Sequence, residues 1–234
     1  GSSISGATTD QNIIQTLIGT NPLVIGGGNR SLTLTDPQCV EDLLPGIGGP
    51  AVLANCHQTN CASGCNPSGT AGMKNALAAN TIAMMLNMRY NVQYRGMSMS
   101  AVSNQGLGCI YVHDCIYYCP GNGSCKLRLF DADGVAHEYP YTVGGLLQMA
   151  NYFLGGNLNL SVGQTVLYST ALNQTVQNVN AYWNEGQVAT SCNPGAGVAP
   201  IGGGDKSIVT GKPNTGNLVD FSLAPNPASN EVTF

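Results

Sequence analysis

Two clusters of cysteine and histidine side chains offer the most obvious chemistry in this 234-residue chain. The first cluster holds Cys56, His57, Cys61 and Cys65, and the second holds His113, Cys115 and Cys119. Thiolate and imidazole are ligands that zinc prefers, and each cluster could supply half of a four-ligand site. The same spacings occur in secreted loops closed by disulfides, and we favour disulfides over a metal centre.

Cysteine usage as a whole supports this choice. Many cysteines in a chain with few charges indicate an oxidising compartment, in which thiols pair. The chain has nine, an odd number, so at least one sulfur stays free or pairs outside the chain. Spacing alone does not decide which cysteines pair. The candidates for disulfide bonding are Cys39, Cys56, Cys61, Cys65, Cys109, Cys115, Cys119, Cys125 and Cys192.

Acidic residues near a glycine raise a calcium hypothesis. Asp131, Asp133 and Glu138 supply oxygen ligands, but D-x-D-G is one ligand pair short of an EF-hand loop. Asp-Gly is also a strong hairpin signal, so we predict a turn at 131–134. We expect His137, on the same hairpin, to face solvent.

Other patterns add no catalytic machinery. The methionines between residues 84 and 99 could bind Cu(I), but on an apolar helix methionine is ordinary core filling. No histidine lies by a G-x-S-x-G elbow or a cysteine-protease signature. The glycine triplets at 26–28 and 202–204 lack the context of a phosphate loop. The sequence thus predicts no catalytic residue, no metal site and no cofactor.

The elements that would position these residues are mainly helical. We predict a mainly α member of the α+β class, a compact helical domain with a small β-hairpin and disulfide-stapled loops. Apolar periodicity and caps predict short helices at 10–18 and 36–44, and three core helices at 73–88, 142–154 and 169–183. A strand is expected at 31–35, a stapled loop at 45–72, and a hairpin from 126–130 and 135–141.

Charge is scarce in this chain. Charged residues make up 9% of it, against roughly 25% in an average globular domain, and the net charge is −4. This composition lacks the basic footprint of nucleic-acid binding. No apolar run reaches the roughly 18–20 residues that span a bilayer. We expect any signal peptide to have been removed already.

The last residues carry a resemblance. Pro225, Asn226, Pro227 and Ala228 follow a hydrophobic residue and precede an alternating stretch. Residues 221–234 resemble the opening of the C-terminal sorting domain of type IX secretion cargo in the Bacteroidetes. The resemblance implies the type IX secretion machinery as a partner and an extracellular or cell-surface location. Such domains continue for several strands, so residues 218–234 match only a truncated start, after a Gly/Pro-rich linker at 193–217.

A set of helix cores and caps carries a second resemblance. Its segments are 32–35, 43–45, 48–53, 77–80, 86–88, 142–151, 154–156 and 180–186. Residues 10 to 190 resemble a module near the C-terminus of long, repeat-containing, often adhesin-like surface proteins of the Bacteroidetes. The cysteine loops at 56–65 and 109–125 depart from it.

We therefore expect residues 1–192 to be a non-catalytic extracellular module of a type IX-secreted cell-surface protein, in adhesion, surface structure or assembly. Self-association and surface glycans fit as partners, because a surface of amides and hydroxyls is less costly to desolvate than one of charges. Two alternatives stay open. One is a secreted metal-binding protein or hydrolase that uses the Cys/His clusters, and the other is a passive spacer.

Overall fold

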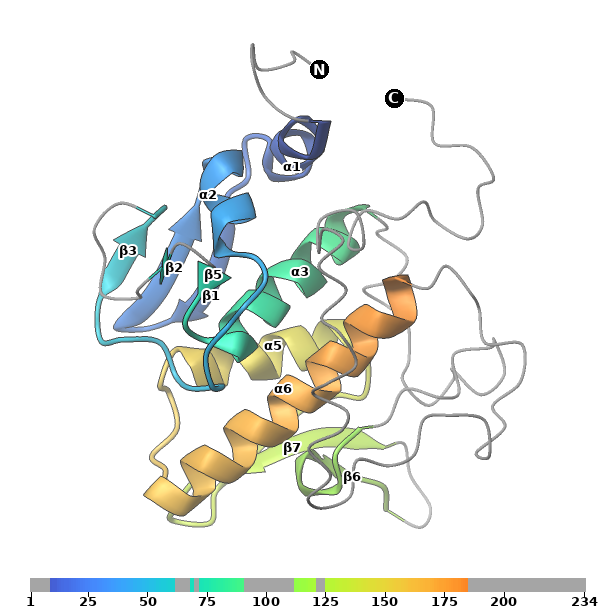
Figure 1. The fold of residues 1–234 in the computed structure, drawn as a ribbon. Helices are drawn as coiled ribbons and strands as arrows, with labels where there is room; N and C mark the ends of the chain where they lie inside the picture. The colour runs from blue at the N-terminus through green and yellow to red at the C-terminus, as the bar shows by residue number, and fades with distance from the viewer. Residues whose placement is uncertain (1–8, 62–67, 70–71, 91–111, 121–124, 185–234) are drawn as a thin grey trace.

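The computed structural model describes residues 9–61, 68–69, 72–90, 112–120 and 125–184. These residues form five α-helices, a short 3-10 helix and three small sheets (Figure 1), which confirms a mixed α+β class. The predicted linker and the sorting residues Pro225, Asn226, Pro227 and Ala228 lie outside the described residues.

The first sheet lies near the N-terminal end of the described chain. It consists of β1 (Leu23–Gly27), β2 (Arg30–Leu34) and β3 (His57–Thr59), with β1 antiparallel and β3 parallel to β2. Alternate side chains of β1 and β2 point into the core, and these are Leu23, Ile25, Leu32 and Leu34. The sequence predicts β2 but neither of its neighbours.

Two short helices accompany this sheet, α1 (Thr9–Ile18) and α2 (Pro37–Leu43), and they pack against each other (Figure 1). As predicted, Asp36 caps the start of α2, because its Oδ1 accepts a hydrogen bond from the Gln38 amide at 3.0 Å. The segment expected to be a loop at 45–72 also contains strands, namely β3 and the pair β4 (Ser68–Gly69) and β5 (Gly72–Met73).

Helix α3 (Ala76–Tyr90) is the centre of the fold, as its apolar residues on every side predict. It contacts α1, α5, α6 and β1, and its buried residues lie on all of its faces. The helix begins at Ala76 and not at Met73, which belongs to β5. Asn75 caps it, because the Oδ1 atom of Asn75 accepts a hydrogen bond from the Ala78 amide.

Helix α5 (Val143–Leu154) lies between the first sheet and the hairpin, in contact with β1, β7 and β8. Its predicted cap is confirmed, since Thr142 Oγ1 accepts a hydrogen bond from the Gly145 amide at 3.0 Å. Gly145 also lets the helix approach the hairpin closely, because a Cβ there would lie 1.9 Å from the carbonyl oxygen of Pro140.

Helix α6 (Val162–Asn184) is longer than the sequence predicts. The prediction that it starts at Ser169 or Thr170 is wrong. Both hydroxyls donate to the Val166 carbonyl within the helix, at 3.0 and 2.9 Å. The true start is a capping box, in which Ser161 Oγ accepts from the Gln164 amide and Gln164 Oε1 accepts from the Ser161 amide.

An asparagine ladder fixes the register of α6 against α3. Asn80 donates to the side-chain oxygen of Asn173 at 3.0 Å, and Asn87 donates to that of Asn180 at 3.3 Å. Asn87 follows Asn80 by seven residues on α3, and Asn180 follows Asn173 by seven residues on α6. The two helices therefore run parallel with a heptad spacing. Asn87 and Asn180 are buried. Buried amide pairs of this kind favour one register, which in turn fixes where the side chains of α6 meet the hairpin at 126–141.

The other three-stranded sheet, which we call the second sheet, contains the predicted hairpin of β7 (Lys126–Phe130) and β8 (Ala136–Pro140), with β6 (Tyr117–Tyr118) added beside β7. The short 3-10 helix η2 (Asp114–Ile116) leads into β6. Leu127 and Leu129 are buried on the inner face, which is turned toward α5 and α6. The opposite face carries Tyr118, Lys126, Arg128, Phe130 and Glu138, and we call this set the outer face.

Candidate functional site

Two disulfides join described cysteines. Cys39 pairs with Cys61 and ties α2 to the segment after β3, and Cys119 pairs with Cys125 and joins the end of β6 to the start of β7. Cys39 lies within α2, in the helix predicted at 36–44, whereas its pairing with Cys61 was left open by the sequence. Cys56 is also disulfide-bonded. Cys65, Cys109 and Cys192 lie outside the described residues.

Among the described cysteines, Cys115 is unpaired. It is half-buried in η2, and burial raises the pKa of its thiol to about 11 from an ordinary value of 9.0. A thiol with a raised pKa is a poor nucleophile near neutral pH. The structure therefore offers no activated cysteine at this position.

Several of the side chains considered as zinc ligands form other bonds in the structure. Cys61 and Cys119 are in disulfides and do not provide thiolates. His57 contacts Ser31, and His113 accepts a hydrogen bond from the backbone amide of Cys115 through Nδ1. Within the described part of the chain, no group of three or more His, Cys, Asp or Glu side chains is placed to hold a metal ion.

The calcium hypothesis does not fit the hairpin. Asp131 Oδ1 accepts a hydrogen bond from the Val135 amide at 3.0 Å, which closes the turn, and Oδ2 lies 3.4 Å from His137 Nε2. Glu138 points to the outer face, where it pairs with Lys126. The predicted turn is thus confirmed, and the three acids do not converge on one ion.

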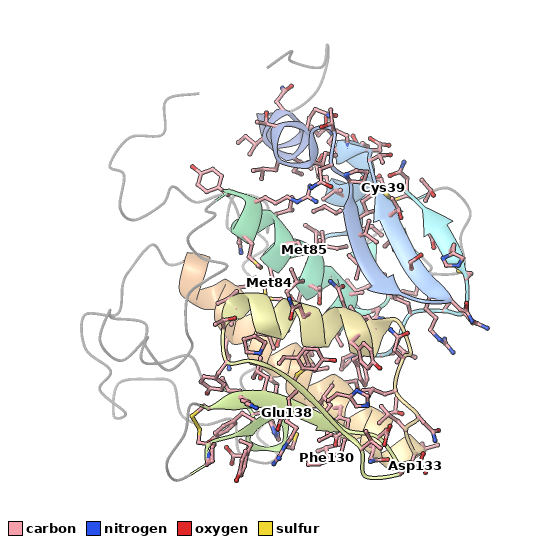
Figure 2. The ribbon with its side chains drawn as sticks, turned by 180° about the vertical axis from the view of Figure 1, so that it is seen from behind. Cys39, Met84, Met85, Phe130, Asp133 and Glu138 are labelled. Atoms are coloured by element: carbon pink, nitrogen blue, oxygen red, sulfur yellow. A yellow bond between two sulfur atoms is a disulfide. The ribbon has the colours of Figure 1, made fainter. Side chains whose placement is uncertain are left out.

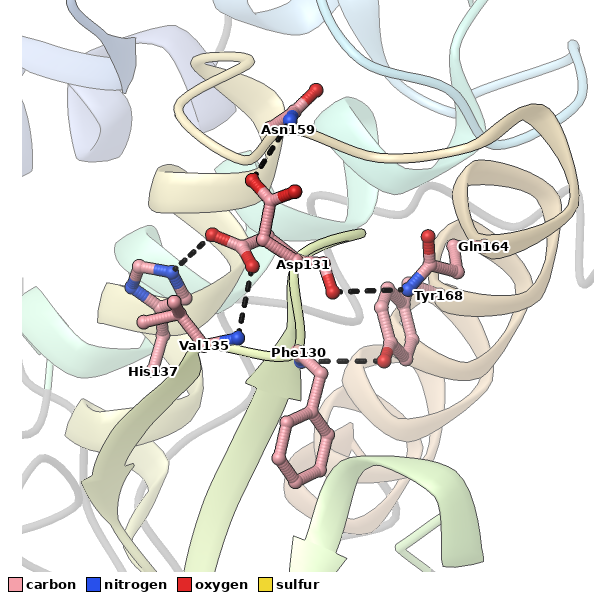
Figure 3. A network of polar contacts seen from close by, with 8 residues as sticks. Phe130, Asp131, Val135, His137, Asn159, Gln164 and Tyr168 are labelled. Carbon is pink, nitrogen blue, oxygen red and sulfur yellow. Dashed lines mark hydrogen bonds and ion pairs between the residues drawn. The ribbon is translucent and has the colours of Figure 1, made fainter.

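The turn is anchored on both sides (Figure 3). The carbonyl of Asp131 accepts a hydrogen bond from Gln164 of α6, and Asp133 accepts one from Asn159, which precedes α6. One residue earlier, the Phe130 amide donates to the hydroxyl of Tyr168 at 3.2 Å. These three contacts, to Asn159, Gln164 and Tyr168, hold the turn and the end of strand β7 against α6 and the segment before it.

His137 is not on a solvent-facing surface, so that prediction is wrong. Its side chain is 25% exposed and packs on the inner face against Tyr152 of α5, with ring centroids 5.2 Å apart. Its neighbours Tyr139 and Tyr141 are half-buried, and burial raises the pKa of each to about 12. This side of the sheet is a packing surface.

The outer face carries an ordered stack of cation and aromatic rings. The guanidinium carbon of Arg128 lies 4.1 Å from the centroid of the Tyr118 ring and 4.7 Å from that of Phe130. Such contacts contribute about 0.5–1 kcal/mol each at exposed sites. Phe130 and Glu138 are labelled on this sheet in Figure 2. The two contacts restrict the position of the planar guanidinium on the outer face.

The donors of that guanidinium are not used by the fold. Lys126 Nζ lies 2.6 Å from Glu138 Oε2, whereas Arg128 Nη1 is 4.0 Å from Glu138 Oε1, too far for a hydrogen bond. No residue in the described part accepts a hydrogen bond from Arg128. The hydrogen bond from Lys126 lowers the pKa of the Glu138 carboxyl below its ordinary value. Glu138 is therefore ionised at neutral pH and forms its ion pair with Lys126.

A second polar pair lies on the first sheet. Ser31 and His57 are cross-strand neighbours on β2 and β3, with Ser31 Oγ 2.7 Å from His57 Nδ1. Serine nucleophiles are activated by such a base, but the base needs a third group to orient it. No described carboxylate contacts the exposed His57 ring, so the pair is an incomplete constellation.

Comparison with known proteins does not assign a family. No protein-family model, no curated protein and no solved structure matches this chain. In the described part, no helix is both long enough and apolar enough to cross a membrane. The function must therefore be argued from the geometry of the outer face.

Sequence reasoning missed the residues of that face. The alternation from Lys126 to Phe130 does place Lys126, Arg128 and Phe130 on one side of a strand, so this part of the face could have been predicted from the sequence. The contribution of Tyr118 could not be predicted from the sequence, because Tyr118 lies in a two-residue strand inside a cysteine-rich segment. Its pairing opposite Lys126 is a tertiary contact.

Proposed function

We propose that this chain is a non-catalytic binding module of an extracellular cell-surface protein, and that the outer face of its second sheet binds surface glycans. One observation carries the proposal, the Arg128 guanidinium that two aromatic rings hold in place while its donors remain free among the described residues. A group that is already oriented loses little entropy when a ligand arrives. Saccharides are rich in hydroxyl acceptors for such donors.

The location of the face supports the same use. Tyr118 is 44% exposed and Lys126 extends into solvent, so an extended ligand has access to the stack. Gln164 donates a hydrogen bond to the Asp131 carbonyl and Tyr168 accepts one from the Phe130 amide, and these two bonds anchor the end of β7 and restrain the face. The disulfides and the low charge are compatible with an extracellular setting. Type IX secretion and its machinery, implied by Pro225 to Ala228, belong to the proposal.

Binding to a glycan array tests this function. We expect the wild-type protein to bind at least one class of immobilised saccharide, and the Arg128→Ala variant to lose that binding. Lys74→Ala is the matched control, because Lys74 is an exposed cation remote in sequence from the outer face. If no saccharide binds, or if Arg128→Ala binds as well as the wild type, the proposal is wrong and a passive spacer is favoured.

The pair of Ser31 and His57 supports one competing function, a hydrolase. Turnover of a nitrophenyl ester distinguishes the two. A hydrolase would lose activity in both Ser31→Ala and His57→Ala, whereas a binding module shows the same background hydrolysis in both variants and the wild type.

A further inference from the structure

We propose that the ligand of the outer face is an acidic glycan, and that a sugar carboxylate binds the Arg128 guanidinium beside the rings of Tyr118 and Phe130. This inference rests on the function proposed above and names the chemistry of its ligand. It follows from the charge of the face, from the free edge of the guanidinium, and from the two rings that flank it.

The charge of the outer face is opposite to that of the whole chain. Lys126 and Arg128 contribute two positive charges and Glu138 one negative charge, which leaves one positive charge, while the chain as a whole carries −4. An anion approaching the protein is therefore attracted to this face and repelled by the average surface. One ligand carboxylate would neutralise the remaining charge.

The guanidinium offers the geometry that a carboxylate requires. Its planar fork forms two parallel N–H···O bonds with one carboxylate, and such charge-assisted pairs are about twice as strong as neutral ones. Glu138 does not fill this role, because its nearest oxygen stays 4.0 Å from Arg128 and Lys126 takes the other. The Tyr118 and Phe130 rings lie 4.1 and 4.7 Å from the guanidinium carbon, and no described residue accepts a hydrogen bond from its N–H groups, so these donors are left for the ligand.

The rings favour a saccharide over an acidic peptide. The C–H groups on the face of a pyranose carry slight positive charge and pack on the negative face of an aromatic ring. Tyr118 is 44% exposed, so part of its ring is available beside the carboxylate position. An acidic peptide would use the charge but would leave this ring surface without a specific partner.

Matched ligands test the inference without altering the protein. The probes are oligosaccharides of galacturonate, alginate and hyaluronate, each with its carboxyl-reduced counterpart, and binding is measured by calorimetry at low salt. We expect at least one acidic probe to bind, and its reduced counterpart to bind roughly 10- to 100-fold more weakly, as the loss of a charge-assisted pair implies.

Variants then locate the site. Arg128→Lys keeps the charge but removes the fork, so we expect a roughly 10-fold loss for the acidic probe and little change for its reduced form. Tyr118→Ala should cost about 2- to 5-fold, the equivalent of one exposed cation–aromatic contact. Lys74→Ala should bind as the wild type does, and circular dichroism verifies that each variant is folded.

Three outcomes overturn the inference. If none of the acidic probes binds, or if the reduced counterparts bind equally well, the ligand is not an acidic glycan. In either case, binding of neutral saccharides through Arg128 would leave the proposed glycan-binding function intact. Failure of the acidic-glycan inference is thereby distinguished from failure of the proposed function. If poly-glutamate binds as tightly as the best acidic saccharide, the face recognises carboxylates without regard to the sugar.

Discussion

The contact between α5 and β8 leads to a prediction at a single glycine. In a Gly145→Ala variant the new Cβ would lie 1.9 Å from the Pro140 carbonyl oxygen, whereas Cβ contacts below 3.0 Å are essentially never seen. Helix and strand would have to separate by about 1 Å, which is the difference between these distances. Overpacking costs about 1–3 kcal/mol, and a backbone oxygen cannot rotate away as a side chain can. Alanine regains up to about 1 kcal/mol of helix propensity. We therefore expect a net loss of about 2 kcal/mol.

Gly163→Ala is the matched control, because it makes the same substitution in a helix where nothing lies within 4 Å of the new Cβ. We expect it to be neutral or to stabilise by up to about 1 kcal/mol. Urea denaturation under oxidising conditions measures both variants. With an m-value near 2 kcal/mol/M, the midpoint of Gly145→Ala should fall by about 1 M. An unchanged midpoint for Gly145→Ala would refute the packing argument, as would an equal loss in Gly163→Ala.

Three further predictions concern reactivity, pH and capping. Iodoacetamide at pH 8 should alkylate Cys115 at least about 100-fold more slowly in the folded protein than in urea, since a pKa of about 11 in place of 9.0 lowers the thiolate fraction by that factor; equal rates by peptide mass spectrometry would contradict this. Tyr139 and Tyr141 ionise near pH 10 in the unfolded chain but only near pH 12 in the folded protein. The urea midpoint should therefore be constant below pH 10 and should fall as the pH rises from 10 to 12. Asn75→Ala should destabilise by about 2–3 kcal/mol in the same urea assay, because Asn75 caps Ala78 and bonds both backbone groups of Ala51, and an unchanged midpoint would contradict this.

Elements set by local interactions are those that the sequence predicts well. Asp36 before a proline and Thr142 before an apolar stripe mark helix starts through bonds that span two or three residues. The Asp-Gly turn at 133–134 is likewise set by contacts within its own loop. Each of these signals lies within one short window, so no tertiary information is needed to interpret it.

The misreadings arise where a local signal and a tertiary contact compete. Ser169 and Thr170 resemble caps, but their hydroxyls bond within a helix that has already begun. The real start was obscured because Val162 and Val166 are 83% and 62% exposed and do not continue the apolar stripe. The pairing of β3 with β2 depends on a distant segment that sequence periodicity does not report.

The candidate site was even less predictable. The hairpin strands were predicted, but the stack on their outer face needs Tyr118, which the chain brings to Lys126 through a separate strand. Disulfide connectivity was inaccessible for the same reason, since Cys39 and Cys61 are 22 residues apart and many pairings are possible. Both features are products of the tertiary fold.

The location of the ion pairs has an experimental consequence. Every ion pair between described residues belongs to the second sheet or its turn, joining Lys126 and Arg128 to Glu138 and His137 to Asp131. Elsewhere the described fold is held by apolar packing, disulfides and hydrogen bonds, including those from Arg30 and Arg89 to backbone carbonyls, and salt weakens these much less than it weakens exposed ion pairs. Raising the salt from about 0.01 M to 1 M shortens the Debye length from about 30 Å to 3 Å. Ionic strength therefore acts on the outer face more than on folding, so salt should release the proposed acidic ligand while the protein stays native.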